Sequence, residues 1–179
     1  MDAHVVSVQV GRARDYPGPP PWRSAFVKEP VAGRVRATAG GLEGDERADL
    51  ENHGAPGHAV LAYALAHYEL WRDEIGLDAG PGGFGENLTV AGADETTVRI
   101  GDLVRVGSAL LEVTYERGPC VKISRRWSRP DLTRRVETTG RTGWYHRVVE
   151  PGELGTGDAY ELVERSPGAQ TILEAMRAR

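Results

Sequence analysis

The stretch VRIGDLVRVGSALLEVTYERGPC, residues 98–120, predicts the fold class of this protein more directly than any other part of its sequence. Short apolar segments are separated by the glycine-containing pairs GD and GS, a pattern typical of antiparallel hairpins. The predicted strands are Val98–Ile100, Leu103–Val106 and Ala109–Tyr115. In the last of these, Leu111, Val113 and Tyr115 alternate with Glu112 and Thr114. We therefore expect the first three side chains to share the buried face of a sheet.

Other segments outside this stretch also have the length and apolar content of strands. They are His4–Val10, Val31–Ala39, Ala59–Tyr63, Leu88–Val90, Trp144–Val149 and Ala159–Val163. Strands toward both ends of the chain favour a closed or nearly closed barrel, because closure removes exposed sheet edges. We predict a mostly β fold, a β-barrel with a few peripheral α-helices.

The clearest helical pattern predicts a helix over Leu65–Ile75. Tyr68 and Trp71 follow Leu65 at helical spacing, and Gly76 stands where a helix C-terminus favours glycine. We interpret this aromatic stripe as core packing and not as a ligand site.

The length of 179 residues suits one domain. We predict that residues 1–165 form a single barrel domain and that residues 166–179 form a short C-terminal tail, with a helix around Thr171 to Met176. The 23 glycines and 11 prolines favour many turns. The glycine-punctuated segment from Gly40 to Gly57 is long for a connection, and long ordered loops are often functional.

Composition restricts the kinds of site. A single cysteine excludes an internal disulfide and any cysteine-rich zinc or iron–sulfur site within this chain. No apolar stretch is long enough to span a bilayer and no secretion signal is present, so we expect a cytoplasmic protein without a membrane partner. The sequence contains neither a phosphate-binding P-loop nor a dinucleotide-binding glycine motif.

Charge is unevenly distributed along the chain. The net charge is −4, yet residues 117–147 contain nine Lys and Arg against two Asp and Glu. Such a local excess attracts anions, although it is also compatible with a solvated helix face. The segment is short and has few aromatic residues, so we expect no nucleic-acid partner.

The only cysteine, Cys120, follows the predicted strand that ends near Tyr115. Proline is favoured at the first helical position, so Pro119 predicts a helix that starts there and places Cys120 in its first turn. The helix dipole, with Arg117 and Lys122 nearby, stabilises a thiolate there. The residue is thus either reactive or metal-binding, or a small buried side chain.

The histidines of the sequence allow other chemistry. His53 and His58 are possible metal ligands, although the spacing in HGAPGH matches no zinc motif. Cys120 with His53 or His146 is a possible nucleophile–base pair, as in cysteine hydrolases. Nothing in the sequence fixes the distances between them.

Several motifs taken together resemble the MOSC domain family, whose domains are related to the C-terminal part of molybdenum cofactor sulfurases, and in particular its stand-alone YiiM-like group. They include WRSAFVKEPVAGRV, GLEGDERADLENHGAPGHAVLAY, GGFGENLTV and the opening stretch extended to VKIS. The resemblance spans Val5 to Val163. Two departures stand out: HGAP replaces the usual HGGP, which places Ala55 at the second glycine, and Tyr115-Glu116 stand where a glutamine or proline is frequent.

The resemblance implies a MOSC-type β-barrel that binds a pterin molybdenum cofactor, with Cys120 as the molybdenum ligand. It implies catalytic roles for Cys120 and His53. The cofactor-binding residues that it implies are Lys28, His53, Gly54, Asn87, Arg117 and Cys120.

The activity implied by the resemblance is molybdenum-dependent reduction of small N-hydroxylated compounds. Because the chain has no flavin, nicotinamide or iron–sulfur motif, electrons are expected from an external donor protein. The alternative is a non-catalytic carrier of the cofactor, or of sulfur as a persulfide on Cys120. Pyridoxal phosphate is not expected as a cofactor, and the sequence leaves the oligomeric state open.

Overall fold

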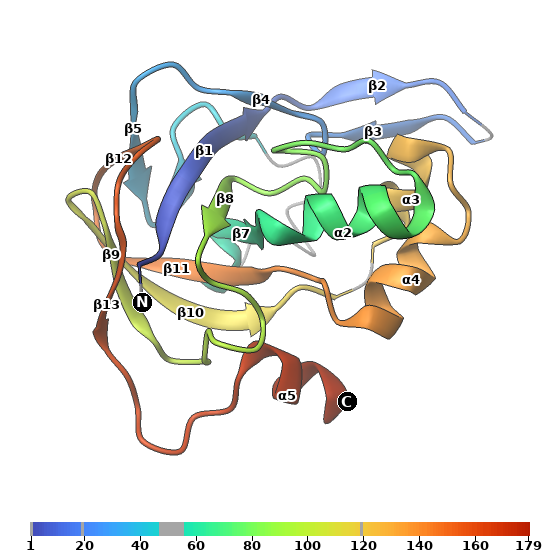
Figure 1. Ribbon diagram of the computed structural model, residues 1–179. Helices are drawn as coiled ribbons and strands as arrows, with labels where there is room; N and C mark the ends of the chain where they lie inside the picture. The colour runs from blue at the N-terminus through green and yellow to red at the C-terminus, as the bar shows by residue number, and fades with distance from the viewer. Residues whose placement is uncertain (1, 19, 47–55, 119) are drawn as a thin grey trace.

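The structure, a computed structural model, describes residues 2–18, 20–46, 56–118 and 120–179. Its main element is an eight-stranded sheet in which neighbouring strands are antiparallel except for one parallel pair, β7 and β8. In spatial order its strands are β13 (Tyr160–Glu164), β9 (Leu103–Val106), β10 (Ala109–Glu116), β11 (Trp144–Glu150), β7 (Val60–Ala64), β8 (Leu88–Ala91), β1 (His4–Gly11) and β4 (Lys28–Pro30) (Figure 1). The protein is therefore mostly β, as predicted.

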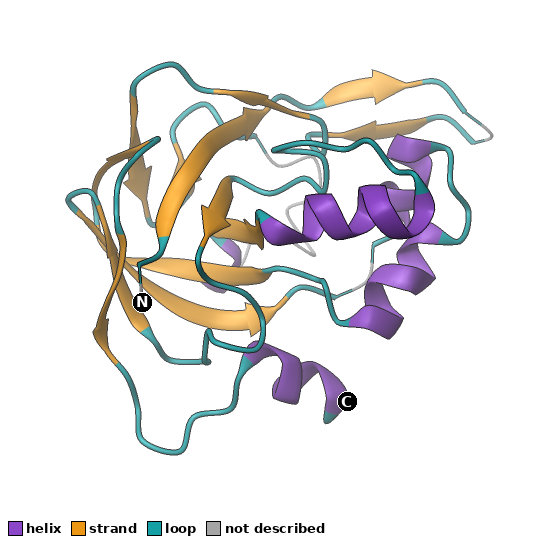
Figure 2. Ribbon diagram, in the orientation of Figure 1, coloured by secondary structure: helices purple, strands orange, loops and turns teal. Residues whose placement is uncertain are grey.

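Two smaller sheets and the helices complete the fold. One small sheet contains β12 (Gly152–Gly155), β5 (Arg34–Thr38) and β6 (Gly41–Leu42). The other is a hairpin of β2 (Arg14–Tyr16) and β3 (Trp22–Ser24). The helices are the 3-10 turn η1 (Pro56–His58), α2 (Ala66–Ile75), α3 (Val121–Trp127), α4 (Leu132–Thr139) and α5 (Ile172–Arg177). Figure 2 shows α2, α3 and α4 gathered toward one end of the curled sheet. No helix in the described parts of the chain is long and apolar enough to cross a membrane.

The large sheet curls into a barrel whose ladder is not continuous. Strands β1 and β13 meet through an isolated bridge between His4 and Ala159. Two backbone hydrogen bonds flank it, from Val5 N to Asp158 O at 2.9 Å and from Tyr160 N to Ala3 O at 2.8 Å. The barrel is therefore nearly closed but not fully closed, because β1 and β13 meet through this isolated bridge and not through a regular ladder.

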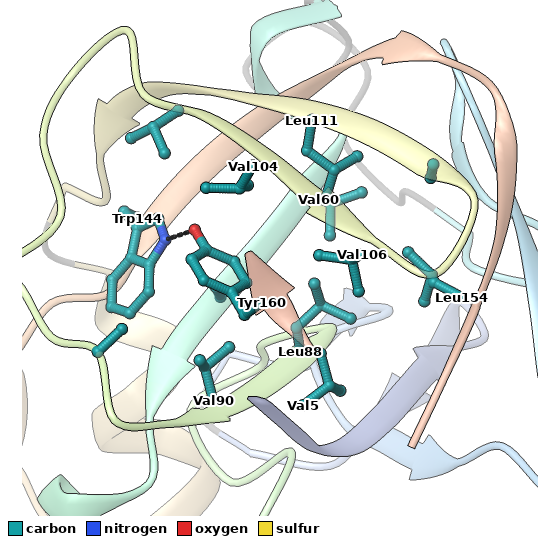
Figure 3. Packing of buried hydrophobic residues seen from close by; sticks show 14 of the residues in the cluster. Val5, Val60, Leu88, Val90, Val104, Val106, Leu111, Trp144, Leu154 and Tyr160 are labelled. Carbon is teal, nitrogen blue, oxygen red and sulfur yellow. Dashed lines mark hydrogen bonds between the residues drawn. The ribbon is translucent and has the colours of Figure 1, made fainter. Parts of the chain in front are cut away.

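The barrel interior is filled by alternating side chains from opposed strands, among them Val5, Leu88, Val104, Leu111 and Trp144 (Figure 3). Each of these is at most 2% exposed. Alternation along β9 and β10 was readable in the sequence because a period of two puts every second residue on one face.

A bulge in β10 overturns one part of that pattern. The pairing of β10 with β11 shifts between Val113 and Glu116, which inserts an irregularity at the end of the strand. As a result Tyr115 is 47% exposed and not buried as predicted, while Glu116 is only 7% exposed. A bulge reverses the side-chain alternation that follows it.

The predicted helix over Leu65–Ile75 is confirmed as α2, with Leu65 as its N-cap and Gly76 in the left-handed conformation at its end. Its stripe packs against the outside of the sheet in a second apolar cluster, where Trp71 is 1% exposed. Trp71 Nε1 donates a hydrogen bond to the Tyr63 hydroxyl at 2.7 Å. The aromatic residues of this helix are thus core, as interpreted.

Other elements differ from the sequence prediction. Val98–Ile100 forms no strand, since only Arg99 makes an isolated bridge, to Thr171. Helix α4 and strand β12 were not predicted. The 166–179 segment contains α5, which begins with a capping box between Thr171 and Glu174 and buries Ile172 completely against the barrel.

Candidate functional site

A pocket of about 390 Å³ opens at the junction of β10 and α3. Four of the six residues that the resemblance implies for cofactor binding line it together: Lys28, Asn87, Arg117 and Cys120. His53 and Gly54 lie outside the described residues. The fold thus brings together side chains from β4, from the segment before β8, from the turn after β10 and from the start of α3.

Cys120 is the N-cap of α3 and not a member of its first turn, because the helix begins at Val121. The predicted start at Pro119, a residue outside the described ones, is therefore two residues too early. Cys120 is half-buried and has the extended backbone conformation of an N-cap. Its carbonyl accepts hydrogen bonds from Ile123 N at 3.0 Å and Thr133 Oγ1 at 3.1 Å, so α3 and α4 together fix the residue that carries the thiol.

Arg117 is the most unusual group in the pocket. Its residue is 5% exposed, and its backbone N–H donates to Gly143 O at 3.1 Å. The guanidinium lies over the Phe26 ring, 5.6 Å from its centroid. Within the described residues Nη1 has no hydrogen-bond partner and no carboxylate forms an ion pair with this side chain. A buried cation without an acid is costly, so the arrangement favours an anionic ligand.

Lys28 is held by a buried acid that the sequence analysis did not single out. Lys28 Nζ lies 2.5 Å from Asp45 Oδ1, and both side chains are less than a tenth exposed. Asp45 also accepts from Gly11 N at 2.7 Å and from Asn87 Nδ2 at 2.9 Å. Asp45 therefore supplies the opposite charge beside the buried lysine and fixes the position of its side chain.

Asn87 lines the pocket, but its side-chain amide forms hydrogen bonds with other residues of the protein. Its Oδ1 accepts from Leu61 N at 3.1 Å, and its Nδ2 donates to Gln9 O at 3.2 Å as well as to Asp45. These bonds connect β1 and β7 with the segment that carries Asp45. The structure therefore gives Asn87 a positioning role in the wall of the pocket.

The preceding residue, Glu86, is fully buried and structural. Its carboxylate accepts from Gly82 N at 2.7 Å, Phe84 N at 3.1 Å and Thr89 Oγ1 at 2.9 Å, and from the Tyr68 hydroxyl. Burial, with the adjacent Glu86 charge, raises the pKa of Tyr68 well above its ordinary value. Glu86 thus fixes the glycine-rich loop before β8.

One wall of the pocket is aromatic. Tyr115, turned outward by the bulge, stacks on His58 with ring centroids 5.2 Å apart, and His58 meets the edge of Tyr145 at 4.7 Å. From the sequence we interpreted His58 only as a possible metal ligand. Among the residues that the structure describes, no group of three His, Cys, Asp or Glu side chains is arranged to hold a metal ion.

His146 is not placed to act as a base for Cys120. It is fully buried inside the barrel, where Nε2 lies 2.7 Å from the Tyr160 hydroxyl and Nδ1 lies 3.2 Å from Val60 O. Burial lowers the pKa of His146 to about 4. The pocket is lined by other residues, so the nucleophile–base pair of Cys120 and His146 considered from the sequence is wrong.

Comparisons with known proteins agree with this architecture. The MOSC domain family profile matches residues 49–161. Protein YiiM of Escherichia coli is 37% identical over 164 residues, which cover 89% of this chain and 72% of that protein. A protein named reductase from Gibberella moniliformis is 36% identical over 158 residues, covering 86% of this chain but only 28% of the relative. The crystal structure of YiiM from Geobacillus stearothermophilus superposes with a TM-score of 0.81 at 30% identity, covering 98% of this chain and 82% of that one.

Proposed function

This chain belongs to the MOSC domain family, and on that premise we propose that it binds a pterin molybdenum cofactor in the pocket beside Cys120 and reduces N-hydroxylated compounds. The observation that carries the proposal is the meeting, in one pocket, of a half-buried thiol and a buried guanidinium that has no acidic partner among the described residues. The name of the Gibberella relative supports a reductase, although this chain spans a minor part of that protein.

The residues present fit such a cofactor. A thiolate is a soft ligand suited to a transition metal, and Cys120 is the only cysteine of the chain. Arg117 offers an unused N–H for an anionic group, and Lys122 lines the same pocket. Three acids line the pocket: Asp45 pairs with Lys28, Glu116 pairs with Arg179 at 2.5 Å, and Glu46 accepts from Ala13 N at 2.8 Å. Among the described residues, Arg117 and Lys122 are therefore the pocket cations that no ion pair engages.

When bound, the cofactor supplies a redox centre that exchanges two electrons. The net reaction is R–NH–OH + 2 e⁻ + 2 H⁺ → R–NH₂ + H₂O, in which the N–O bond breaks and the oxygen leaves as water. The chain contributes the thiol ligand, the cationic groups that hold the anionic part of the cofactor, and an aromatic wall of Tyr115, His58 and Tyr145. His53 and Gly54 keep their implied roles beside the cofactor as part of the proposal.

Cys120→Ser tests the proposal, because it nearly preserves volume while replacing a soft thiolate by a hard hydroxyl. Protein prepared with a cofactor supply is measured for molybdenum by elemental analysis and for turnover of an aromatic hydroxylamine with a reduced viologen dye. We expect Cys120→Ser to lose turnover while its unfolding midpoint stays unchanged. Thr133→Val serves as a control, because it disturbs the same turn but leaves the thiol, and it should keep measurable turnover.

The outcomes separate the possible roles. Full turnover by Cys120→Ser with bound molybdenum would show that the thiol is not the ligand. Wild-type protein that retains the cofactor or a persulfide but turns over no N-hydroxylated compound would favour the carrier function.

A further inference from the structure

The cations of residues 117–147 are concentrated on two helices at one end of the molecule. Helices α3 and α4 lie next to each other there, beyond the end of the sheet that carries β10 and β11 (Figure 1). Thr133 of α4 bonds both Ser124 and Cys120, which makes the two helices one packed unit. The basic segment of the sequence therefore forms a local surface, which we name the α3–α4 face.

Three exposed arginines on this face have no acidic partner among the described residues. Arg125, Arg126 and Arg134 are exposed, and none forms an ion pair within the described residues. Aromatic rings orient two of them, since the Arg125 guanidinium lies 5.9 Å from the Trp22 ring and that of Arg126 lies 5.0 Å from the Trp127 ring. Stacking fixes a guanidinium but leaves its charge unneutralised.

Two further arginines on this face are neutralised. Arg129 and Arg135 share the carboxylate of Asp131, at 3.8 and 2.5 Å. Asp131 is thus used locally, and Glu137 is the other acid of this segment. Residues 121–139 contain six Lys and Arg against these two acids, so the face has a net positive charge. This contrasts with the chain as a whole, whose net charge is −4.

The α3–α4 face adjoins the pocket at the start of α3. Lys122 of α3 lines the pocket, and the helix starts directly after Cys120. With a rise of 1.5 Å per residue, Arg125 and Arg126 lie about 8–9 Å along the helix from Cys120. A molecule bound to these arginines is therefore held next to the thiol.

We propose that the α3–α4 face docks a small acidic electron-transfer protein that carries a one-electron iron–sulfur or flavin centre. The inference rests on the proposed function, whose reaction consumes two electrons that this carrier delivers in two encounters. Electron tunnelling falls steeply with distance, so the donor must bind close to the pocket. An acidic protein is attracted to this face and repelled by the acidic remainder of the surface, which orients it.

The same charges argue against a nucleic acid or an anionic membrane. Outside residues 117–147 the chain carries 24 acidic and 13 basic residues. An extended polyanion would meet that acidic surface, whereas a small protein contacts a single face.

The test measures binding of a strongly acidic [2Fe–2S] ferredoxin by calorimetry, without any requirement for molybdenum or turnover. The variant is Arg126→Glu, and the matched control is Arg36→Glu. Arg36 is exposed on β5 and forms no ion pair with a described residue, so both substitutions change the charge equally. We expect Arg126→Glu to weaken binding about tenfold at low salt and the control to change it less than about twofold. Raising ionic strength from about 0.02 M to 0.2 M should weaken wild-type binding strongly.

Three results would overturn the inference: no binding of the ferredoxin by the wild type at low salt, equal weakening by both variants, or tighter binding of duplex DNA to the same face. Turnover with the viologen dye tests the proposed function separately. If dye-driven turnover fails while the ferredoxin still binds through Arg126, the proposed reaction is wrong and the docking face stands.

Discussion

Arg117→Met is the substitution for which the structure gives the least intuitive expectation. Removing an arginine from a folded core usually destabilises a protein, because the charge has a partner that is left behind. Among the described residues Arg117 has no ion-pair partner that its removal would leave behind, and its Nη1 already has no hydrogen bond. Methionine is about as long as the aliphatic stem of arginine and is flexible enough to pack against Phe26.

The magnitude follows from three contributions. An unsatisfied buried donor costs about 1–3 kcal/mol, and the cationic charge adds a desolvation cost. Both disappear in the variant. The lost contact with the Phe26 ring offsets about 0.5–2 kcal/mol of this gain. We therefore expect the ligand-free variant to be more stable than the wild type by about 1 kcal/mol.

The assay is urea unfolding followed by tryptophan fluorescence, in a buffer without multivalent anions and then with inorganic phosphate. At a phosphate concentration about ten times its dissociation constant, the wild type should gain about 1.4 kcal/mol and the variant nothing. Arg141→Met is the matched control, because Arg141 makes a bidentate pair with Glu74 at 2.7 and 2.8 Å and stacks on Trp71. The Arg141→Met variant should have a lower free energy of unfolding than the wild type.

A loss of more than about 1 kcal/mol in ligand-free Arg117→Met would refute the reasoning. Such a loss would mean that the guanidinium is satisfied in the folded protein and that its charge is structural. An equal phosphate response in the wild type and the variant would show that the anion binds elsewhere.

Three further predictions follow from other parts of the molecule. Trp71→Ala should lower the free energy of unfolding by about 3–5 kcal/mol, with Trp71→Phe losing less, and an unchanged midpoint would show that the stripe of α2 is exposed. His146 has a folded-state pKa of about 4, below its ordinary 6.5, so the unfolded chain binds more protons between these values and stability should fall as pH decreases from 6.5 to 4, by roughly 3 kcal/mol in total. His146→Gln should remove this part of the pH dependence, and an unaltered slope would assign it to other groups. Purified chain should turn over an N-hydroxylated compound with an artificial electron donor but not with NADH alone, so NADH-driven turnover without added flavin would contradict the need for a donor protein.

The sequence determined the features that depend on neighbours along the chain. Alternation in Leu103–Val106 and along β10 predicted the strands, because side chains of an extended chain point to opposite faces in turn. Helical spacing around Trp71 predicted α2 and its buried face for the same kind of local reason. Several motifs in the same order along the chain, from Val5 to Val163, were enough to indicate the MOSC family, which the comparisons confirm.

The tertiary structure decided which groups of the pocket are paired. Asp45 and Asn87 are 42 positions apart and Lys28 is 17 positions from Asp45, so no local pattern could join them. The outward turn of Tyr115 depends on a mismatch between β10 and β11, a property of two strands and not of one. That Arg117 is buried with no acid paired to it in the described part of the chain is likewise a property of everything that packs around it. Pairing and burial are set by contacts between distant segments, and these exist only once the chain has folded.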